Sequence, residues 1–282
     1  MSTIALPRRI SDAPGYSYFV GSALFHYLGP AFAVLLFARV GPPGVAWLRI
    51  ATAAVVYAAW RRPWRHFSRT AVAVGAVLAV MNVCFYLAIA RLPLGTVAAI
   101  EFLPVIALAA VGVRTRRNAF ALLAAVAGVY LLAEVRLSGE PLGFLLAFAN
   151  AGLFAVYIVL AHRLAQNGSS AGIDGLAAAM LVALVVVTPL GGWDAASAFA
   201  SPVALAAGLG VGITSSVIPY VCDQLAMARM PRSTYALLVS VLPAVATVIG
   251  IVVLAQFPHP GELAGVALVV AGVALHNERR QD

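Results

Sequence analysis

The chain has 282 residues, of which 63% are apolar and 10% charged, with a formal net charge of +8. Soluble domains carry charge on about a quarter of their residues, so this composition excludes a soluble domain and indicates a bilayer protein. The basic residues are all arginines and stand singly or in short clusters between apolar runs. That spacing favours loop charges that set membrane topology over a nucleic-acid-binding surface.

Apolar segments follow one another along the whole chain, and most approach the ~20 residues that a helix needs to cross a bilayer. We therefore predict an all-α integral membrane protein with ten transmembrane helices. The predicted spans are 16–38, 43–60, 71–90, 94–113, 119–134, 142–161, 174–190, 202–228, 233–254 and 262–276.

The chain contains an internal repeat. Residues 83–93 read VCFYLAIARLP and residues 221–231 read VCDQLAMARMP, with seven identities in eleven positions at an offset of 138. Two copies of one unit in an apolar chain are typical of membrane transporters, whose working site lies where the copies meet. We accordingly place the first unit at 1–140 and the second at 141–282.

Loop arginines predict the orientation, because cytoplasmic loops accumulate basic residues. With the N-terminus inside, the inner segments hold fourteen arginines and the outer segments hold three, Arg39, Arg91 and Arg136. Both termini are thus expected in the cytoplasm. Five helices per unit is an odd number, so the second unit must be inverted. The loops agree with this: 61–69 is arginine-rich, whereas its counterpart 191–199 has no basic residue.

Three stretches resemble the EamA-type branch of the drug/metabolite transporter superfamily. They are VGPPGVAWLRIA (40–51), MNVCFYLAIARLPLGTVAAIEFLP (81–104) and SSVIPYVCDQLAMARMP (215–231). Within this branch the chain is most similar to bacterial inner-membrane threonine/homoserine exporters, with aromatic amino-acid exporters as cousins. The resemblance implies two inverted five-helix repeats around a central substrate cavity, which work by alternating access. One departure is Leu242 before Pro243, where the exporters commonly carry a carboxylate.

Formal charges inside the predicted spans are rare and costly, so they are candidate functional residues. Arg49 and Glu101 both lie ~10 Å below the outer face at 1.5 Å per residue. We favour a buried ion pair between them. Two alternatives remain open: Glu101 is a protonation or substrate-ammonium site whose partner changes with conformation, or one side chain snorkels outward.

Asp223 is the third intramembrane charge, ~8 Å from the inner end of its span. Its repeat counterpart is Phe85, so the two units are chemically unequal at this position. A carboxylate here suits substrate-ammonium binding or proton coupling, and a gate at the inner mouth or a water-facing structural role is the alternative.

Prolines and polar side chains complete the predicted site. Prolines within spans free backbone carbonyls, so we expect hinges or kinks at Pro30, Pro104, Pro219 and Pro243. Polar side chains in lipid should face a cavity, and Phe32, Trp47 and Phe154 are expected to supply its apolar walls. The candidate cavity residues are Tyr27, Asn82, Tyr86, Glu101, Asn150, Tyr157, Ser216, Tyr220, Asp223 and Ser240.

The five histidines are scattered, and the common hydrolase and zinc-protease motifs are missing from the sequence, so we expect neither an enzyme nor a metal or other cofactor site. We predict a bacterial inner-membrane secondary transporter that exports small amino acids, as a monomer or weak dimer, with protons as a candidate coupling ion. A transporter of another metabolite or a translocase for lipid or cell-wall precursors is the alternative.

Overall fold

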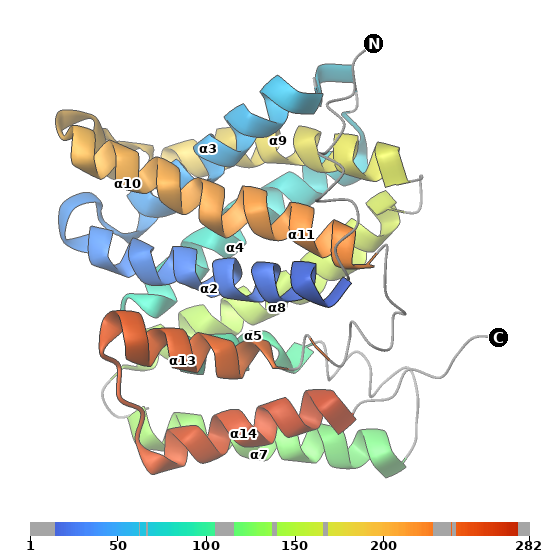
Figure 1. The fold of residues 1–282 in the computed structure, drawn as a ribbon, viewed down its shortest axis with the longest axis vertical. Helices are drawn as coiled ribbons and strands as arrows, with labels where there is room; N and C mark the ends of the chain where they lie inside the picture. Colours follow the sequence, from blue (N-terminus) through green and yellow to red (C-terminus); the bar gives the residue numbers. More distant parts are fainter. Residues whose placement is uncertain are drawn as a thin grey trace.

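The computed structural model describes residues 15–61, 63–65, 67–104, 116–136, 140–165, 169–227, 238 and 241–275. Its regular structure is helical throughout these ranges, and the helices run roughly side by side across the molecule (Figure 1). The prediction of an all-α protein is therefore confirmed.

Each predicted span contains a described helix, and the observed helices extend a few residues beyond most predicted ends. The described parts of the spans 94–113 and 233–254 are shorter, because residues 105–115, 228–237 and 239–240 lie outside the described ranges. The helices are α2 (Gly15–Val40), α3 (Pro42–Arg61), α4 (Arg69–Ile89), α5 (Leu94–Glu101), α7 (Arg116–Arg136), α8 (Pro141–Ala165), α9 (Ser169–Ala195), α10 (Pro202–Gly212), α11 (Ile218–Met227), α13 (Leu242–Leu254) and α14 (Pro260–Leu275).

Within the described residues, five segments are long and apolar enough to cross a membrane. Three shorter apolar helices lie in α7, α13 and α14. The protein is thus a multi-pass membrane protein. The long segments are Gly15–Val40, Arg69–Ile89, Pro141–Ala161, Asp174–Ala200 and Pro202–Asp223.

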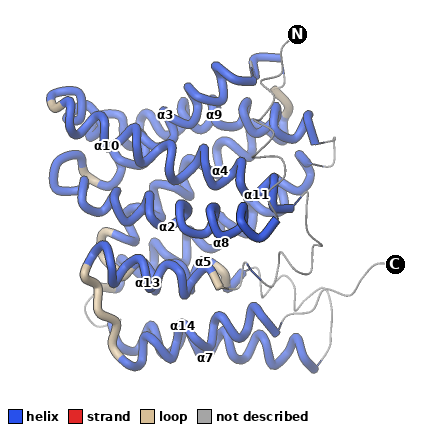
Figure 2. Tube along the Cα trace, viewed as in Figure 1, coloured by secondary structure: helices blue, strands red, loops and turns tan. Residues whose placement is uncertain are grey.

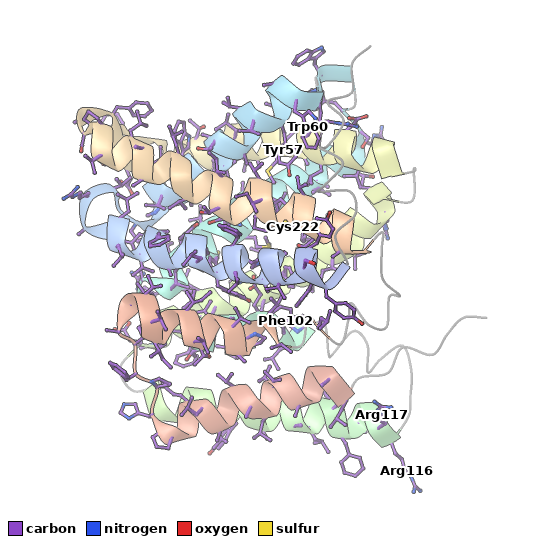
Figure 3. All side chains as sticks on the ribbon, viewed as in Figure 1. Tyr57, Trp60, Phe102, Arg116, Arg117 and Cys222 are labelled. Carbon is purple, nitrogen blue, oxygen red and sulfur yellow. The ribbon has the colours of Figure 1, made fainter. Side chains whose placement is uncertain are left out.

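Three pairs of helices from opposite halves of the chain pack side by side: α3 with α9, α5 with α13, and α7 with α14. Arg61 at the end of α3 meets Asp174 near the start of α9, and the backbone nitrogen of Leu94 at the start of α5 bonds Gln256 just beyond α13. Arg117 at the start of α7 donates to the last carbonyl of α14, Leu275, at 2.7 Å (Figure 3). Each pair is therefore antiparallel.

The short connections gather at one end of the helices. The α2–α3, α4–α5, α9–α10 and α13–α14 connections all lie along the left edge in Figures 1 and 2. These connections come from different parts of the sequence. They lie at the same end because successive helices run in alternating directions. All four lie in loops that the sequence assigns to one side of the membrane.

The prolines interrupt the helices less uniformly than predicted. Pro30 lies inside the continuous helix α2, and Pro104 follows a turn at Phe102 where α5 ends. Pro219 is the second residue of α11, which directly follows a π-helix, η3 (Ile213–Val217), in the middle of the eighth span. Pro243 stands in the first turn of α13, where its missing N–H breaks no hydrogen bond of that helix, so the hinge expected there stays a prediction.

Glycine brings α4 and α9 into close contact. A Cβ built on Gly75 would meet the carbonyl oxygen of Ala179 and lie 2.7 Å from the Cβ of Val182. The backbone carbonyl of α9 has little freedom to yield. By contrast, a Cβ built on Gly152 of α8 meets nothing within 4 Å. The two positions therefore form a matched pair for testing the packing.

We expect Gly75→Ala to lower the free energy of unfolding by about 1–3 kcal/mol through overpacking, despite the better helix propensity of alanine. Gly152→Ala gains the same propensity without a clash and should be neutral or stabilising. Thermal unfolding of both variants in detergent micelles checks this. Equal midpoints for the two variants would contradict the close α4–α9 packing.

Candidate functional site

Arg49 lies in the middle of the helix bundle with 7% of its surface exposed. Its Nε donates to the Ser216 hydroxyl at 2.8 Å, and a terminal nitrogen donates to the Ser215 carbonyl at 3.0 Å. Its guanidinium carbon lies 5.8 Å from the centroid of the Tyr86 ring. Both serines belong to the π-helix η3, whose altered backbone hydrogen bonding leaves a carbonyl for the arginine. Neutral groups therefore hold the guanidinium.

Glu101 ends α5 and is also 7% exposed. The side-chain amide of Asn150, which is fully buried in α8, donates to its Oε1 at 3.1 Å. Tyr27 of α2, also fully buried, lies within electrostatic range of the carboxylate. A neutral amide thus holds the carboxylate. We call the group Tyr27, Arg49, Tyr86, Glu101, Asn150, Ser215 and Ser216 the polar centre.

The predicted ion pair between Arg49 and Glu101 is not formed in the structure. Both charges are buried as expected, but no nitrogen–oxygen contact within 4.0 Å joins them. The physical reason lies in η3: its Ser215 carbonyl and Ser216 hydroxyl offer Arg49 two acceptors. The two charges nevertheless lie within electrostatic range of each other.

A second group of predicted residues continues the polar centre towards α11. The hydroxyls of Tyr157 and Tyr220 are hydrogen-bonded, and Asp223 lies within electrostatic range of both. Tyr220 is also within range of Arg49 and Glu101, so the two groups adjoin.

Aromatic rings from α8 wall this region. Phe154 stacks on Tyr157 with the ring centroids 6.2 Å apart and meets Phe102 edge-on at 6.1 Å. Phe154 thus lies beside a candidate cavity residue, Tyr157, and its role as an apolar wall stays a prediction.

Other predicted residues lie elsewhere. Asn82 is buried but donates to its own helix, at the Leu78 carbonyl, 2.8 Å away. Phe32 is 46% exposed on the outside of α2, so it does not wall the centre, because its helical position turns it away from the bundle. Trp47 instead bonds Thr188 of α9 at 2.9 Å. Ser240 lies outside the described residues.

Sequence reasoning missed the ion pair between Arg61 and Asp174, whose nitrogen and oxygen lie 2.8 Å apart. The arginine stands in the arginine-rich loop 61–69 and the aspartate is the first residue of the predicted span 174–190, and no local pattern links residues so distant in sequence. It also missed the π-helix, which no residue type specifies by itself. Gln256 accepts a hydrogen bond from the first backbone N–H of α5 and so caps that helix.

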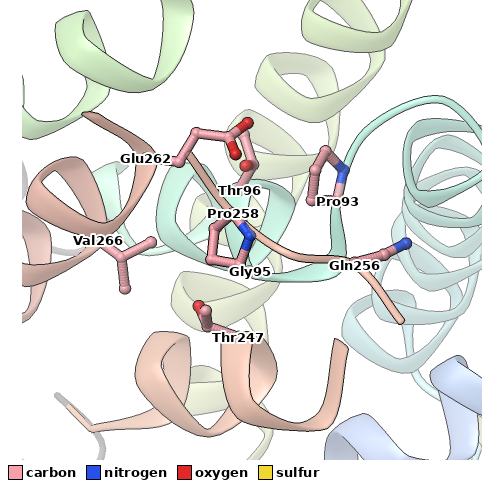
Figure 4. Close-up of a pocket in the computed structure, with 8 residues that line it drawn as sticks. All are labelled: Pro93, Gly95, Thr96, Thr247, Gln256, Pro258, Glu262 and Val266. Carbon is pink, nitrogen blue, oxygen red and sulfur yellow. The ribbon is translucent and has the colours of Figure 1, made fainter. Parts of the chain in front are cut away.

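Two cavities lie away from the polar centre. A cavity of about 10 Å³ lies among the ends of α5, α13 and α14, close to Gln256 and Glu262 (Figure 4). It has room for about one water molecule and excludes an amino acid. A groove of about 540 Å³ between α3 and α9 has ample volume. Its lining contains no formal charge: Trp47, Thr188, Pro189, Gly192, Trp193, Ala196 and Phe199.

The polar centre therefore remains the best candidate site in the described part of the chain. It is closed in this structure, since its fully buried members Tyr27, Tyr86, Asn150 and Ser215 have no exposed surface. Access must involve separation of the helices that carry it. No metal-binding cluster of histidine, cysteine and acidic residues occurs among the described side chains.

Because Arg49 and Glu101 bond to different neutral groups and not to each other, we predict that Glu101→Gln does not destabilise the protein. The substituted side chain keeps an oxygen that accepts from Asn150, and it removes a charge from a buried position, so thermal stability in micelles should be unchanged or higher. Glu101→Ala is the control that leaves the amide unpaired and should lower stability. A loss of about 3–5 kcal/mol in Glu101→Gln would indicate that a direct ion pair with Arg49 is broken.

Comparisons with known proteins identify the family. The sequence model of the EamA-like transporter family matches residues 141–277. The threonine/homoserine exporter RhtA of Escherichia coli strain K12 is 30% identical over 251 residues, which cover 86% of this chain and 84% of that protein. RhtA of Salmonella typhimurium strain LT2 is 32% identical over 240 residues, covering 81% and 79%.

A solved crystal structure with 21% sequence identity shares the fold, with a TM-score of 0.55 and coverage of 97% of this chain and all of the other. The extent and identity of the match to the two exporters show the family, and the helical membrane architecture agrees with it. The chain belongs to the EamA-like transporter family.

Proposed function

We propose that this transporter exports small neutral amino acids such as threonine and homoserine across the bacterial inner membrane, as a secondary transporter. The observation that carries the proposal is similarity to threonine/homoserine exporters over more than four fifths of the chain. The polar centre supports it, because a polar amino acid needs charged and hydrogen-bonding groups inside an otherwise apolar bundle. Aromatic amino acids are further candidate substrates.

Two inverted five-helix repeats, 1–140 and 141–282, form the scaffold in this proposal. In such a repeat, corresponding helices run in opposite directions. The packed pairs α3–α9, α5–α13 and α7–α14 join corresponding spans, and each is antiparallel. The contact of α4 with α8 has its counterpart in the contact of α2 with α11. This interchange supports a two-fold axis in the membrane plane.

Both termini lie in the cytoplasm in the proposed orientation. The four short connections at one end of the bundle belong to loops with few arginines, as expected for the outer side (Figure 2). Arg61 and Asp174 then lie at the inner ends of α3 and α9. Their bond ties corresponding helices of the two repeats together on the cytoplasmic side.

Alternating access requires the repeats to move relative to each other around the polar centre. The turn at Phe102, η3 and the start of α13 at Leu242 are interruptions where such movement can concentrate, because each lacks a continuous α-helical ladder. Pro30, Pro104, Pro219 and Pro243 remain hinge candidates on this basis.

Counterflow in proteoliposomes tests the function. Vesicles loaded with unlabelled threonine or homoserine should accumulate labelled threonine well above protein-free vesicles, because exchange needs no external energy source. A panel of other amino acids defines the substrate range. Absence of flux for every amino acid would overturn the exporter proposal, and flux of a lipid or cell-wall precursor instead would favour the translocase alternative.

Proton coupling is the proposed role of Asp223, a half-buried carboxylate beside the hydrogen-bonded pair Tyr157 and Tyr220. If it carries the proton, Asp223→Asn should abolish stimulation of threonine efflux by a pH gradient while counterflow at equal pH continues. Asp194→Asn, at an exposed position, is the control. An unchanged response to the gradient in Asp223→Asn would leave this carboxylate with a structural role.

A further inference from the structure

The polar centre holds two opposite charges that do not neutralise each other. Arg49 is bonded to a hydroxyl and a carbonyl, and Glu101 to an amide. Each is more than nine-tenths buried. Hydrogen bonds from neutral groups offset only part of the cost of burying a charge, so each site keeps a strong preference for a group of opposite charge.

Unpartnered polar atoms surround the two charges. Among the described residues, the hydroxyls of Tyr27, Tyr86 and Ser215 and the Asn150 carbonyl oxygen are buried without a hydrogen-bond partner. Buried polar groups are nearly always paired in folded proteins, and each exception requires an explanation. Four exceptions around one pair of charges suggest that these atoms meet a ligand.

The unpartnered atoms near Arg49 differ chemically from those near Glu101. Two residues with unpartnered hydroxyl groups contact Arg49: its guanidinium carbon lies 5.8 Å from the Tyr86 ring centroid, and it binds the carbonyl of Ser215. Hydroxyls and a guanidinium donate hydrogen bonds and suit a carboxylate. Beside Glu101 lies the free amide oxygen of Asn150, which only accepts. A carboxylate with an amide oxygen suits an ammonium group.

We infer that Arg49 and Glu101 are the two recognition ends of one zwitterion site. Arg49, with the Tyr86 and Ser215 hydroxyls, binds the α-carboxylate, and Glu101, with the Asn150 oxygen, binds the α-ammonium. The Tyr27 hydroxyl completes the Glu101 end. The inference rests on the proposed function and adds to it the atoms that recognise the amino-acid backbone. It makes the site selective for compounds that carry both charges, because a singly charged compound leaves one buried charge unmatched.

Competition against labelled threonine in wild-type counterflow provides the first test. 1-Amino-2-propanol lacks the carboxylate of threonine and 3-hydroxybutyrate lacks its ammonium group. Loss of one charge-assisted contact should weaken each about tenfold to a hundredfold relative to threonine. Threonine counterflow itself tests the proposed function. If threonine exchanges but either analogue competes equally well, the zwitterion site is wrong and the exporter proposal stands.

Charge-neutral variants then assign the two ends. In Arg49→Gln the advantage of threonine over 1-amino-2-propanol should fall to about onefold, while its advantage over 3-hydroxybutyrate persists. In Glu101→Gln the pattern should be reversed. Ligand-induced thermal stabilisation in micelles measures these ratios even if a variant no longer transports. Equal weakening of all three compounds in both variants would overturn the assignment and make the charges structural.

Tyr86→Phe tests the carboxylate end even if the charge-neutral variants do not fold. It removes only a hydroxyl that has no hydrogen-bond partner in the described structure. Its thermal stability without ligand should match or exceed the wild type. Its binding of threonine and 3-hydroxybutyrate should weaken about threefold to tenfold, with 1-amino-2-propanol unaffected. Tyr130→Phe, on the exposed side of α7, is the matched control. Unchanged threonine binding in Tyr86→Phe would contradict the carboxylate end.

Discussion

The cost of burying charge in an apolar bundle is the constraint on which the central structure depends. Hydrocarbon supplies no hydrogen bonds, so a guanidinium inside the bundle requires acceptors from neighbouring helices. Arg49 obtains them from Ser215 and Ser216 of the π-helix η3. Three helices meet through this side chain: α3, which carries it, the interrupted eighth span, and α4, whose Tyr86 lies beneath it. The π-helix therefore supplies the acceptors that the buried arginine needs, and the arginine in turn binds a carbonyl of the π-helix.

The buried charges are distributed unequally between the two halves of the chain. In the proposed inverted repeat, the spans that correspond to each other are packed antiparallel. Asp223 corresponds in sequence to Phe85, and Glu101 corresponds to Ser240 when the second copy carries one extra residue, so the charged groups occupy one copy of each related position. If the proposed inverted repeats form the scaffold, this unequal chemistry lets its inward- and outward-facing states differ in energy.

Packing between the helices depends on small residues rather than on a hydrophobic driving force. Gly75 allows α4 to approach the backbone of α9, and Gly29 gives Ser215 its place against α2. Each of these close approaches involves a helix that carries the polar centre, α4 in the first case and α2 in the second. The interruptions at Phe102 and in η3 lie beside the two charges, so movement of the helices and release of a bound molecule would act on the same atoms.

The sequence by itself determined the helical class, the positions of most spans, and the burial of Arg49 and Glu101. Hydrophobic run length and the cost of charge in lipid are local properties that a sequence displays directly. The repeat and the arginine distribution also pointed to inversion, which stays a proposal that the antiparallel pairs support.

Only the tertiary structure decided which atoms the charges meet. Arg49 and Glu101 have matching depths, so depth alone favoured an ion pair, yet η3 and Asn150 hold them separately. Depth fixes one coordinate, whereas a contact also depends on helix rotation and on neighbours more than a hundred residues away. The exposed Phe32 and the Arg61–Asp174 bridge have the same origin. Packing between distant segments, which no local pattern encodes, set these features.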